Sequence, residues 1–277
     1  MKSRVSWVSR ILPFLLISMA VSAMSAERFL PRADDTDVFS GVRAAIRQEL
    51  LKDGVPSLAV GVAKKGKIIW EEAFGLADIA RGIASTPETM YSLASISKPF
   101  TATGLMVLVE RGLVDLDRPA NDYLGEAKLT VFEGDSSSVT VKHLLHHTAG
   151  LGTHWNFFFA NEPAERPDME ESIRRYGICV WPPGTIYNYA NFGYGILEHI
   201  IERASKMRYP DFMSTEVFEP LGLGRTSVIT RAPGDDFVAQ RYISARSVLP
   251  FYDFDHRGAS AVYSSARDLL RFGMFHL

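Results

Sequence analysis

Two strand-like runs joined by a short polar turn place the strongest constraint on the fold of this chain. Residues 56–63 and 68–74 are apolar and include β-branched side chains, and the segment 64–67 between them has the sequence Lys-Lys-Gly-Lys. Apolar runs joined by a short turn that contains glycine are typical of a β-hairpin. We therefore expect an antiparallel hairpin that forms the edge of a sheet.

Helical patterns lie on both sides of this hairpin. Apolar residues recur at helical spacing over residues 37–53, and Gly54 and Pro56 end that pattern. Residues 75–90 contain Gly, Ser, Thr and Pro and are expected to form a loop. The same helical spacing predicts a helix that carries residues 100–109 and ends at Gly112, a short helix over 140–147, a helix over 193–204, and a final helix from Ser265 through Phe272.

The charge composition argues against a nucleic-acid partner. The 277 residues are 47% hydrophobic and 22% charged, with a formal net charge of −2. A chain without excess positive charge has little electrostatic attraction for nucleic acid, so we expect no nucleic-acid partner.

Cys179 is the only cysteine and lies in an apolar stretch. No disulfide can therefore form within the chain, and we expect a buried thiol with no catalytic role.

The N-terminal residues have the layout of a secretory signal peptide. An apolar run over 11–24 is preceded by three basic residues, Lys2, Arg4 and Arg10. The run is too short for a comfortable membrane span, and no comparable run follows Ala26. We expect residues 1–26 to be removed, which leaves an exported protein, periplasmic or extracellular, without a stable membrane span. The alternative is an uncleaved anchoring helix.

Ser95 and Lys98 form the first candidate catalytic pair. A serine hydroxyl is a poor nucleophile at neutral pH and needs a neighbouring base. A spacing of three residues places both side chains on one face of the helix expected there. Lys98 can act as that base only if burial or a nearby cation lowers its pKa. The alternative is that Ser95 caps the helix and Lys98 is a solvated charge.

Tyr189 and Asn191 form the second candidate group. They belong to a Tyr-Ala-Asn sequence that lies between the turn at 182–185 and the apolar helical run that follows. Catalytic side chains are often carried by loops held between rigid elements. The alternative is that Tyr189 is an ordinary buried aromatic residue.

These two groups and their neighbours resemble the penicillin-recognising serine enzymes. Residues 91–102 resemble the first motif of that family, S-x-x-K, and residues 183–194 resemble the second motif in its Tyr-x-Asn form. The similarity is therefore to class C β-lactamases, D-Ala-D-Ala carboxypeptidases, D-aminopeptidases and β-lactamase-like esterases, and less to class A enzymes. Further stretches resemble the family in the same order, at residues 56–74, 112–119, 144–151, 220–224 and 263–269.

The resemblance implies a fold and a role for each candidate residue. The fold would be α+β, an antiparallel sheet flanked by helices with a helical lobe. Ser95 would attack a carbonyl and form an acyl-enzyme, and its backbone N–H would be one donor of the oxyanion hole. Lys98 and Tyr189 would share the transfer of the Ser95 proton to the leaving group, and either of them is the base. Asn191 would hydrogen-bond the substrate or Lys98.

We therefore expect an exported serine hydrolase that needs no cofactor. Its small-molecule or peptide substrate would be a β-lactam, a D-amino-acid peptide or a small ester, and the fold alone does not select among these. The alternative is a catalytically silent relative that binds peptidoglycan fragments or a protein partner through the same groove. The enzyme is favoured because all four candidate residues, Ser95, Lys98, Tyr189 and Asn191, are present.

Two other side-chain clusters have competing interpretations. The first consists of His143, His146 and His147, in which the first and last share a helix face as zinc ligands do. No Glu follows the first His and no distant ligand is evident, so we expect a helix end and turn there and no metal site. The second is the aromatic run 155–159, which either lines an acyl pocket or packs in the core.

The expected hydrolase domain, residues 27–277, has no counterpart of the family's third motif. In the family this motif, Lys-Thr-Gly or His-Thr-Gly, lies on a central strand and gives the second oxyanion N–H. The resemblance continues through residues 264–268 and the helix after them. We expect that the domain is incomplete at its C-terminus, that its C-terminal strands are missing, and that the chain as given is largely inactive.

The N-terminal pattern gives a testable prediction. We expect cleavage after Ala23 or Ala26, because small residues at that point are typical of signal removal. The intact mass of protein recovered from the exported fraction should match a chain that begins at Met24 or Glu27. A chain that still carries Met1 in that fraction would contradict this expectation and favour a membrane anchor.

Overall fold

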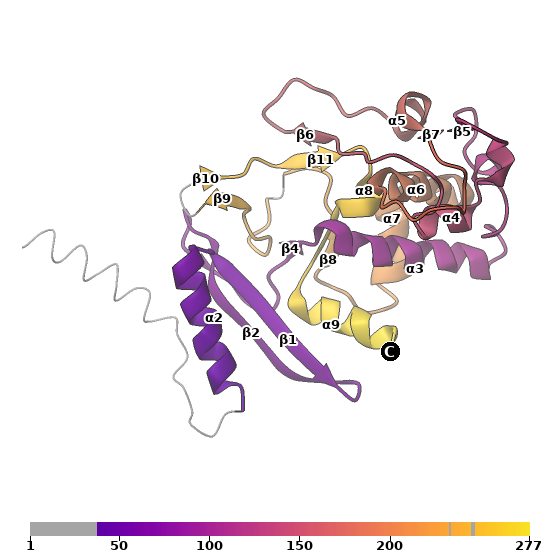
Figure 1. Ribbon diagram of the computed structural model, residues 1–277. Coiled ribbons are helices and arrows are strands. Elements are labelled where there is room, and N and C mark those ends of the chain that lie inside the picture. The colour runs from indigo at the N-terminus through magenta and orange to yellow at the C-terminus, as the bar shows by residue number, and fades with distance from the viewer. Residues whose placement is uncertain (1–37, 233, 245–246) are drawn as a thin grey trace, which may run out of the picture.

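The computed structural model describes residues 38–232, 234–244 and 247–277. The expected signal segment, residues 1–26, lies outside this part of the chain. The described residues form a hairpin unit on one side and a helical lobe on the other, as Figure 1 shows. Within this part of the chain, no helix combines the length and the apolar character that a membrane crossing requires.

The expected hairpin is confirmed. β1 (Ser57–Lys64) pairs antiparallel with β2 (Lys67–Asp78). β2 extends beyond the expected strand and pairs with β3 (Ile83–Ala84), so the prediction of a loop over 75–90 was wrong in its first part. Gly75 allows the extension, because its φ of +80° lies in the left-handed region and a Cβ there would lie 2.1 Å from a carbonyl oxygen.

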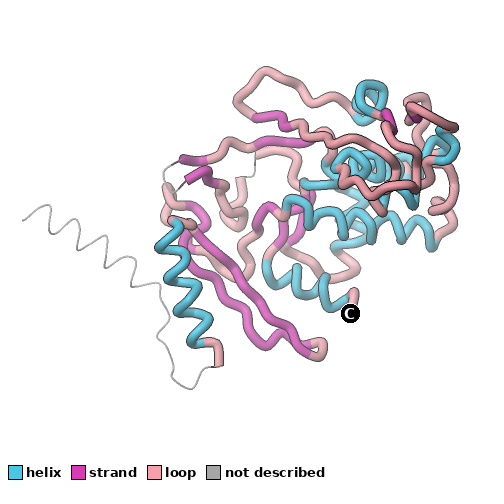
Figure 2. Tube along the Cα trace, viewed as in Figure 1, coloured by secondary structure: helices cyan, strands magenta, loops and turns pink. Residues whose placement is uncertain are grey.

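The two faces of the hairpin are covered by two helices, α2 (Ser40–Asp53) and α9 (Ala266–Phe275). The ring of Trp70 stacks on Phe39, just before α2, with 4.5 Å between the centroids. Leu270 of α9 packs against Gly61 on the opposite face, because side chains of a strand alternate between faces. Figures 1 and 2 show that α9 lies between the hairpin and the helical lobe.

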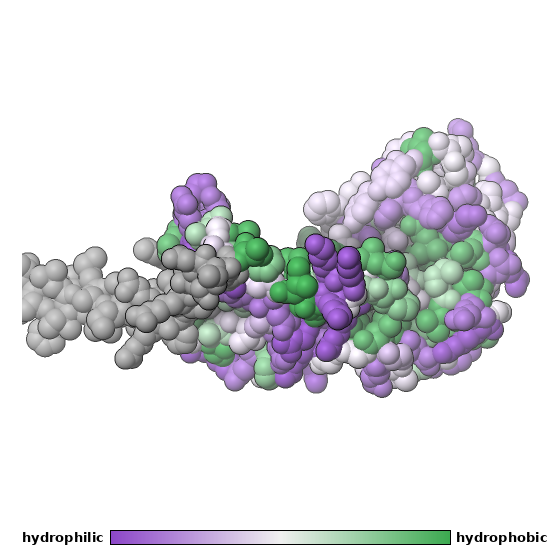
Figure 3. Space-filling model, turned by 90° about the horizontal axis from the view of Figure 1, so that it is seen from below, coloured by the Kyte–Doolittle hydropathy of each residue, from purple (hydrophilic) through white to green (hydrophobic). Residues whose placement is uncertain are grey.

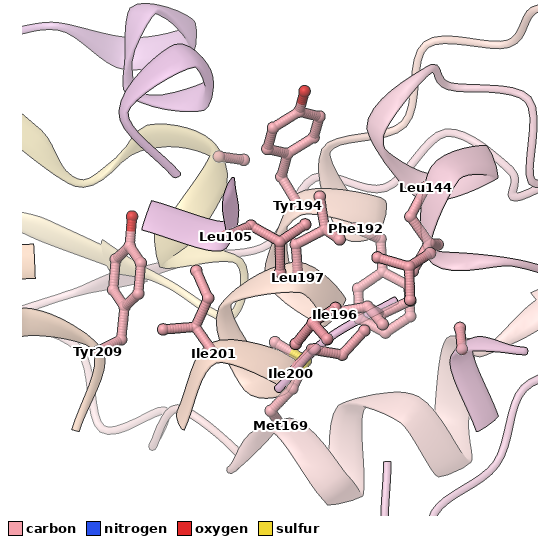
Figure 4. Packing of buried hydrophobic residues seen from close by; sticks show 14 of the residues in the cluster. Leu105, Leu144, Met169, Phe192, Tyr194, Ile196, Leu197, Ile200, Ile201 and Tyr209 are labelled. Atoms are coloured by element: carbon pink, nitrogen blue, oxygen red, sulfur yellow. The ribbon is translucent and has the colours of Figure 1, made fainter. Parts of the chain in front are cut away.

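The helical lobe is built around two packed helices, α3 (Ser97–Glu110) and α6 (Asn191–Ser205). Its other α-helices are α4 (Val141–Leu145), α5 (Met169–Tyr176), α7 (Tyr209–Met213) and α8 (Arg257–Ser260). Single turns of 3₁₀ helix lie at Ala94–Ile96, Ala120–Asp122 and Ser136–Ser138, and one π-helical turn lies at Ser214–Phe218. Leu105 and Leu197 are fully buried in the core between these helices (Figure 4). The helices expected from spacing are confirmed.

Short strands complete the fold. β4 (Tyr91–Ser92), β12 (Val262–Ser264) and β8 (Thr226–Val228) form an antiparallel sheet in that order. The remaining pairs are β6 (Phe157–Phe159) with β11 (Tyr252–Phe254), β9 (Tyr242–Ser244) with β10 (Ser247–Val248), and β5 (Thr130–Val131) with β7 (Ile178–Cys179), of which the last is parallel. The expected α+β class is confirmed, as several small sheets with helices.

Cys179 lies in β7 and is fully buried. Burial raises the pKa of its thiol to about 12. A thiol with this pKa carries almost no thiolate at neutral pH, so the prediction of a small buried hydrophobe is confirmed.

The surface carries apolar patches bordered by hydrophilic residues, as the view from below in Figure 3 shows. Exposed apolar side chains include Met106 of α3 and Leu113 just after it, which are 45% and 49% exposed. Because more than half of the surface of folded proteins is apolar on average, exposure of single residues of this kind carries no functional meaning.

Gly150 gives a prediction about stability. It has a φ of +83°, and a Cβ there would lie 2.0 Å from the carbonyl oxygen of Trp181. We expect Gly150→Ala to lower the free energy of unfolding by about 3 kcal/mol, because an L-residue is disfavoured in this conformation and the backbone it meets cannot move freely. Urea unfolding would measure the loss.

The matched control is Gly112→Ala. Gly112 has a φ of +69°, and nothing lies within 4 Å of the position of a Cβ. We expect this variant to lose only about 1 kcal/mol, the cost of the left-handed conformation alone. Equal losses in the two variants would contradict a role for the contact at residue 181.

Candidate active site

Ser95 lies in the single turn Ala94–Ile96, between β4 and α3. The chain enters this turn from the small sheet, where the Leu93 N–H donates to the Val262 carbonyl at 3.0 Å. Ala94 has a φ of +46°, in the left-handed region that residues with a side chain rarely adopt. Strained backbone of this kind gathers at functional sites, where the surrounding structure holds it. The hydroxyl of Ser95 is thus presented by a rigid, strained turn.

Lys98 lies in the first turn of α3 and is only 5% exposed. Its Nζ donates to Ser95 Oγ at 3.2 Å, to Asn191 Oδ1 at 2.9 Å and to the Ala259 carbonyl at 3.2 Å. A charged ammonium has three N–H donors, and these contacts use all of them. When Lys98 is neutral, the contact with Ser95 can reverse, because the nitrogen then has a lone pair that accepts the Ser95 proton.

The charge of Lys98 is destabilised by its surroundings. Burial lowers the pKa of Lys98, and contact with the Tyr189 hydroxyl offsets part of that decrease. All three of its hydrogen-bond acceptors are uncharged groups. Lowering the pKa by burial is the condition that a lysine base requires, since only the neutral amine can take a proton.

Tyr189 is a second side chain in contact with Ser95. Its hydroxyl donates to Ser95 Oγ at 2.8 Å, and its ring centroid lies 4.7 Å from Lys98 Nζ. Tyr189 is 40% exposed, so it is not the buried core aromatic of the alternative interpretation. The hydroxyl of Ser95 therefore has one proton-transfer partner that is buried and one that faces the open side.

Asn191 is the first residue of α6. Its Oδ1 accepts from Lys98, and its Nδ2 donates to the His154 carbonyl at 3.4 Å. Of the two contacts expected for Asn191, the structure shows the one with Lys98. All four residues named from the sequence therefore converge on one site, while their catalytic roles stay predictions.

Sequence reasoning missed the support beneath these residues. The carboxylate of Asp255 is fully buried. It accepts hydrogen bonds from His154 Nε2 at 2.8 Å, Asn156 Nδ2 at 3.0 Å and His256 Nδ1 at 2.6 Å. Burial opposes ionisation of Asp255, but the hydrogen bonds from the two histidines outweigh it and lower its pKa. His154 and Asn156 lie about a hundred residues before Asp255 in the sequence, so no local pattern could identify the network.

This network connects two of the Lys98 contacts. The His154 carbonyl holds Asn191, and His256 comes directly before α8, which carries Ala259. The Asp255 carboxylate therefore ties together the two segments that place acceptors around the lysine amine.

His154, Asp255 and His256 form the one group with metal-ligand geometry in the part of the chain that the structure describes. The ligand atoms of His154, Asp255 and His256 lie within 4.8 Å of one another. Both carboxylate oxygens already accept hydrogen bonds, which a metal ion would have to replace. The arrangement fits a structural hydrogen-bond network better than a metal site.

The other two sequence clusters have structural positions. His143 closes the cap of α4, where its Nδ1 contacts the Ser138 carbonyl at 3.1 Å. In the aromatic run, residues 157–159 form β6 and pair with β11, while Trp155 is 65% exposed. The run is therefore partly strand and partly surface, and it is not a compact core cluster.

Comparison with known families agrees with this geometry. A family model described as Beta-lactamase matches residues 42–277. The chain belongs to this family. The family resemblance expected from the two motifs is thereby confirmed, and it extends over most of the chain.

Curated relatives carry several descriptions. The chain is 34% identical over 174 residues to "Penicillin-binding protein 4*" of Bacillus subtilis (strain 168), covering 61% of this chain and 37% of the relative. It is 27% identical over 290 residues to "Serine beta-lactamase-like protein LACTB, mitochondrial" of Homo sapiens, covering 79% and 53%. It is 30% identical over 185 residues to "Esterase EstB" of Burkholderia gladioli, covering 62% and 47%. The chain spans about half the length of these relatives, or less.

A solved structure has the same fold. It is described as the octameric penicillin-binding protein homologue from Pyrococcus abyssi, with a TM-score of 0.72 and 27% sequence identity. The similarity covers 87% of this chain and 56% of that one. The expected fold, of the β-lactamase and penicillin-binding-protein type, is confirmed.

Proposed function

We propose that the chain is an exported serine hydrolase that forms an acyl-enzyme on Ser95. The observation that carries this proposal is the convergence of two proton-transfer groups on one hydroxyl. Lys98 Nζ lies 3.2 Å from Ser95 Oγ, and the Tyr189 hydroxyl lies 2.8 Å from it. A nucleophile within hydrogen-bond reach of a base, itself oriented by a third group, is the arrangement that covalent catalysis needs. Membership of the Beta-lactamase family supports the same reaction class.

In the proposed reaction, neutral Lys98 takes the proton of Ser95 as Oγ attacks the substrate carbonyl. The Oγ–C bond forms, and the carbonyl oxygen gains negative charge, which the Ser95 backbone N–H stabilises. The bond from the carbonyl carbon to the leaving group then breaks. Tyr189 gives its proton to the leaving group and regains one from Lys98. Water hydrolyses the acyl-enzyme in the second half of the reaction by the reverse transfers.

The assignment of Lys98 as base and Tyr189 as acid follows from their environments. Burial lowers the pKa of Lys98, which favours the neutral amine. Tyr189 is partly exposed, so its hydroxyl is the more accessible of the two groups to a leaving group. A buried base and a partly exposed acid, both in contact with Ser95 Oγ, divide the proton transfer between them.

The proposed substrates share an acyl carbonyl bonded to a nitrogen or oxygen leaving group: a β-lactam, a D-amino-acid peptide or a small ester. Similarity to proteins described as a penicillin-binding protein and an esterase supports this range. Choosing among the three requires direct measurement, because one scaffold hosts many reactions.

Covalent labelling tests the proposal. Folded protein is incubated with a fluorescent penicillin and, separately, with p-nitrophenyl acetate, and the modified residue is mapped by mass spectrometry. We expect an acyl adduct on Ser95 and none in Ser95→Ala; because the adduct needs only one acylation event, it forms even in a chain with little turnover. We expect Lys98→Ala and Tyr189→Phe to slow acylation by about 10²–10⁴-fold, the usual loss for a proton-transfer group.

Ser137→Ala is the control, because Ser137 is an exposed serine in a separate turn. It should acylate at the wild-type rate. A Ser95→Ala protein that hydrolyses the ester as fast as wild type would show that the nucleophile is wrong. Folded wild-type protein without an adduct would favour the catalytically silent binder.

A further inference from the structure

One residue outside the group of four holds the chain on both sides of Tyr189. The carbonyl of His147 accepts the Asn188 N–H at 2.8 Å. Its ring nitrogen Nδ1 accepts the Ala190 N–H at 3.2 Å. The backbone N–H groups of the two residues on either side of Tyr189 are therefore held by the backbone and the side chain of a single histidine.

The ring of His147 also packs on the tyrosine itself. Its centroid lies 4.5 Å from that of Tyr189 and 5.2 Å from that of the buried Tyr194 on α6. The imidazole is thus placed between a catalytic candidate and the core of the helical lobe. Movement of this ring would move the Tyr189 hydroxyl relative to Ser95.

The backbone at His147 explains how one residue makes both contacts. His147 has a φ of +57°, in the left-handed region, at the end of the segment that contains α4. This conformation turns its carbonyl and its side chain toward the same loop. Histidine, asparagine and aspartate are several-fold enriched in this region among residues other than glycine.

The contact with Ala190 requires an unprotonated Nδ1, which places the ring proton of neutral His147 on Nε2. Burial, and then the positive charge of Lys98, lower the pKa of His147 to about 4. The other titratable groups that face the ring are Tyr187, Tyr189 and Tyr194, and burial raises the pKa of Tyr194 to about 12. No carboxylate among these neighbours favours the imidazolium form.

We propose that His147 is a positioning residue, which holds the Tyr189 hydroxyl against Ser95 without touching the substrate. The proposal rests on the function proposed for Ser95 and adds a residue to it. The proposed role belongs to His147 and not to its sequence neighbour His146. His146 is exposed and has no comparable side-chain contact with the Tyr189 loop.

The kinetic test compares three variants with an activated ester. His147→Phe keeps a flat ring but removes the acceptor for the Ala190 N–H, and we expect kcat to fall about 10–100-fold with little change in KM, because small displacements of a catalytic group have effects of this size. His147→Asn keeps an acceptor oxygen and suits the left-handed backbone, so it should recover most of the rate. His146→Ala is the control and should match wild type.

A second measurement does not depend on activity. Amide hydrogen exchange of Ala190 should be fast in His147→Phe and protected in His147→Asn and in wild type. The pH dependence of the melting temperature reports the protonation of His147. In the unfolded chain this histidine binds a proton below about pH 6.5, whereas in the folded protein its pKa is lowered to about 4, so it stays neutral down to about that pH. Stability should therefore fall as pH decreases through this window, and less so in His147→Asn.

Each outcome bears on one proposal. Wild-type kcat in His147→Phe, with an intact Ser95 adduct, would overturn the positioning role and leave the hydrolase standing. Protected Ala190 in His147→Phe would overturn it as well, even if no substrate were found. Loss of the Ser95 adduct from wild type would instead overturn the proposed function, while the exchange experiment would still decide the structural role of His147.

Discussion

The site depends on the environment of one amine, that of Lys98. Its three contacts, with Ser95, Asn191 and the carbonyl of Ala259, come from segments far apart in the sequence. A buried amine needs such partners, because removing a charge or an amine from water without hydrogen bonds is costly. These contacts exist only when α3, α6 and α8 pack together, so the packing of the helical lobe and the assembly of the site are one event.

Small residues make that packing possible. A Cβ on Gly195 of α6 would lie 2.9 Å from the backbone of His256, and a Cβ on Gly258 of α8 would lie 2.5 Å from a carbonyl oxygen of α6. The Gly258 N–H donates to Glu198 at 2.8 Å. Burial raises the pKa of Glu198 to about 8, so at neutral pH it holds α8 mostly as an uncharged acid. The close approach brings the Ala259 carbonyl within reach of Lys98.

Local patterns predicted much of the fold and the central residues of the site. The hairpin and the helices follow from the spacing of apolar residues, and Ser95, Lys98, Tyr189 and Asn191 follow from two motifs with distinct sequences. The Ala259 carbonyl could not be predicted, because a backbone acceptor has no side-chain signature. The extension of β2 was missed because it depends on the left-handed conformation of Gly75.

Tertiary contacts account for the other omissions. Asp255 and His154 are joined across about a hundred residues, and neither lies in a recognisable motif. His147 was assigned to a helix end and turn, which describes its backbone correctly. Its role at Tyr189 depends on the direction of its ring, which only the folded chain defines. Sequence therefore identifies the groups that would react, and structure identifies the groups that hold them.

The protonation state of Lys98 tests the account most directly. Nitrogen NMR of the folded protein, with the Lys98 Nζ resonance assigned by its loss in Lys98→Arg, would follow this amine as pH is raised. Because burial disfavours its charge, the account predicts that Lys98 loses its proton below the ordinary lysine value of about 10.4. Titration at or above that value would contradict it, since Lys98 would then be a fixed cation and not the base for Ser95.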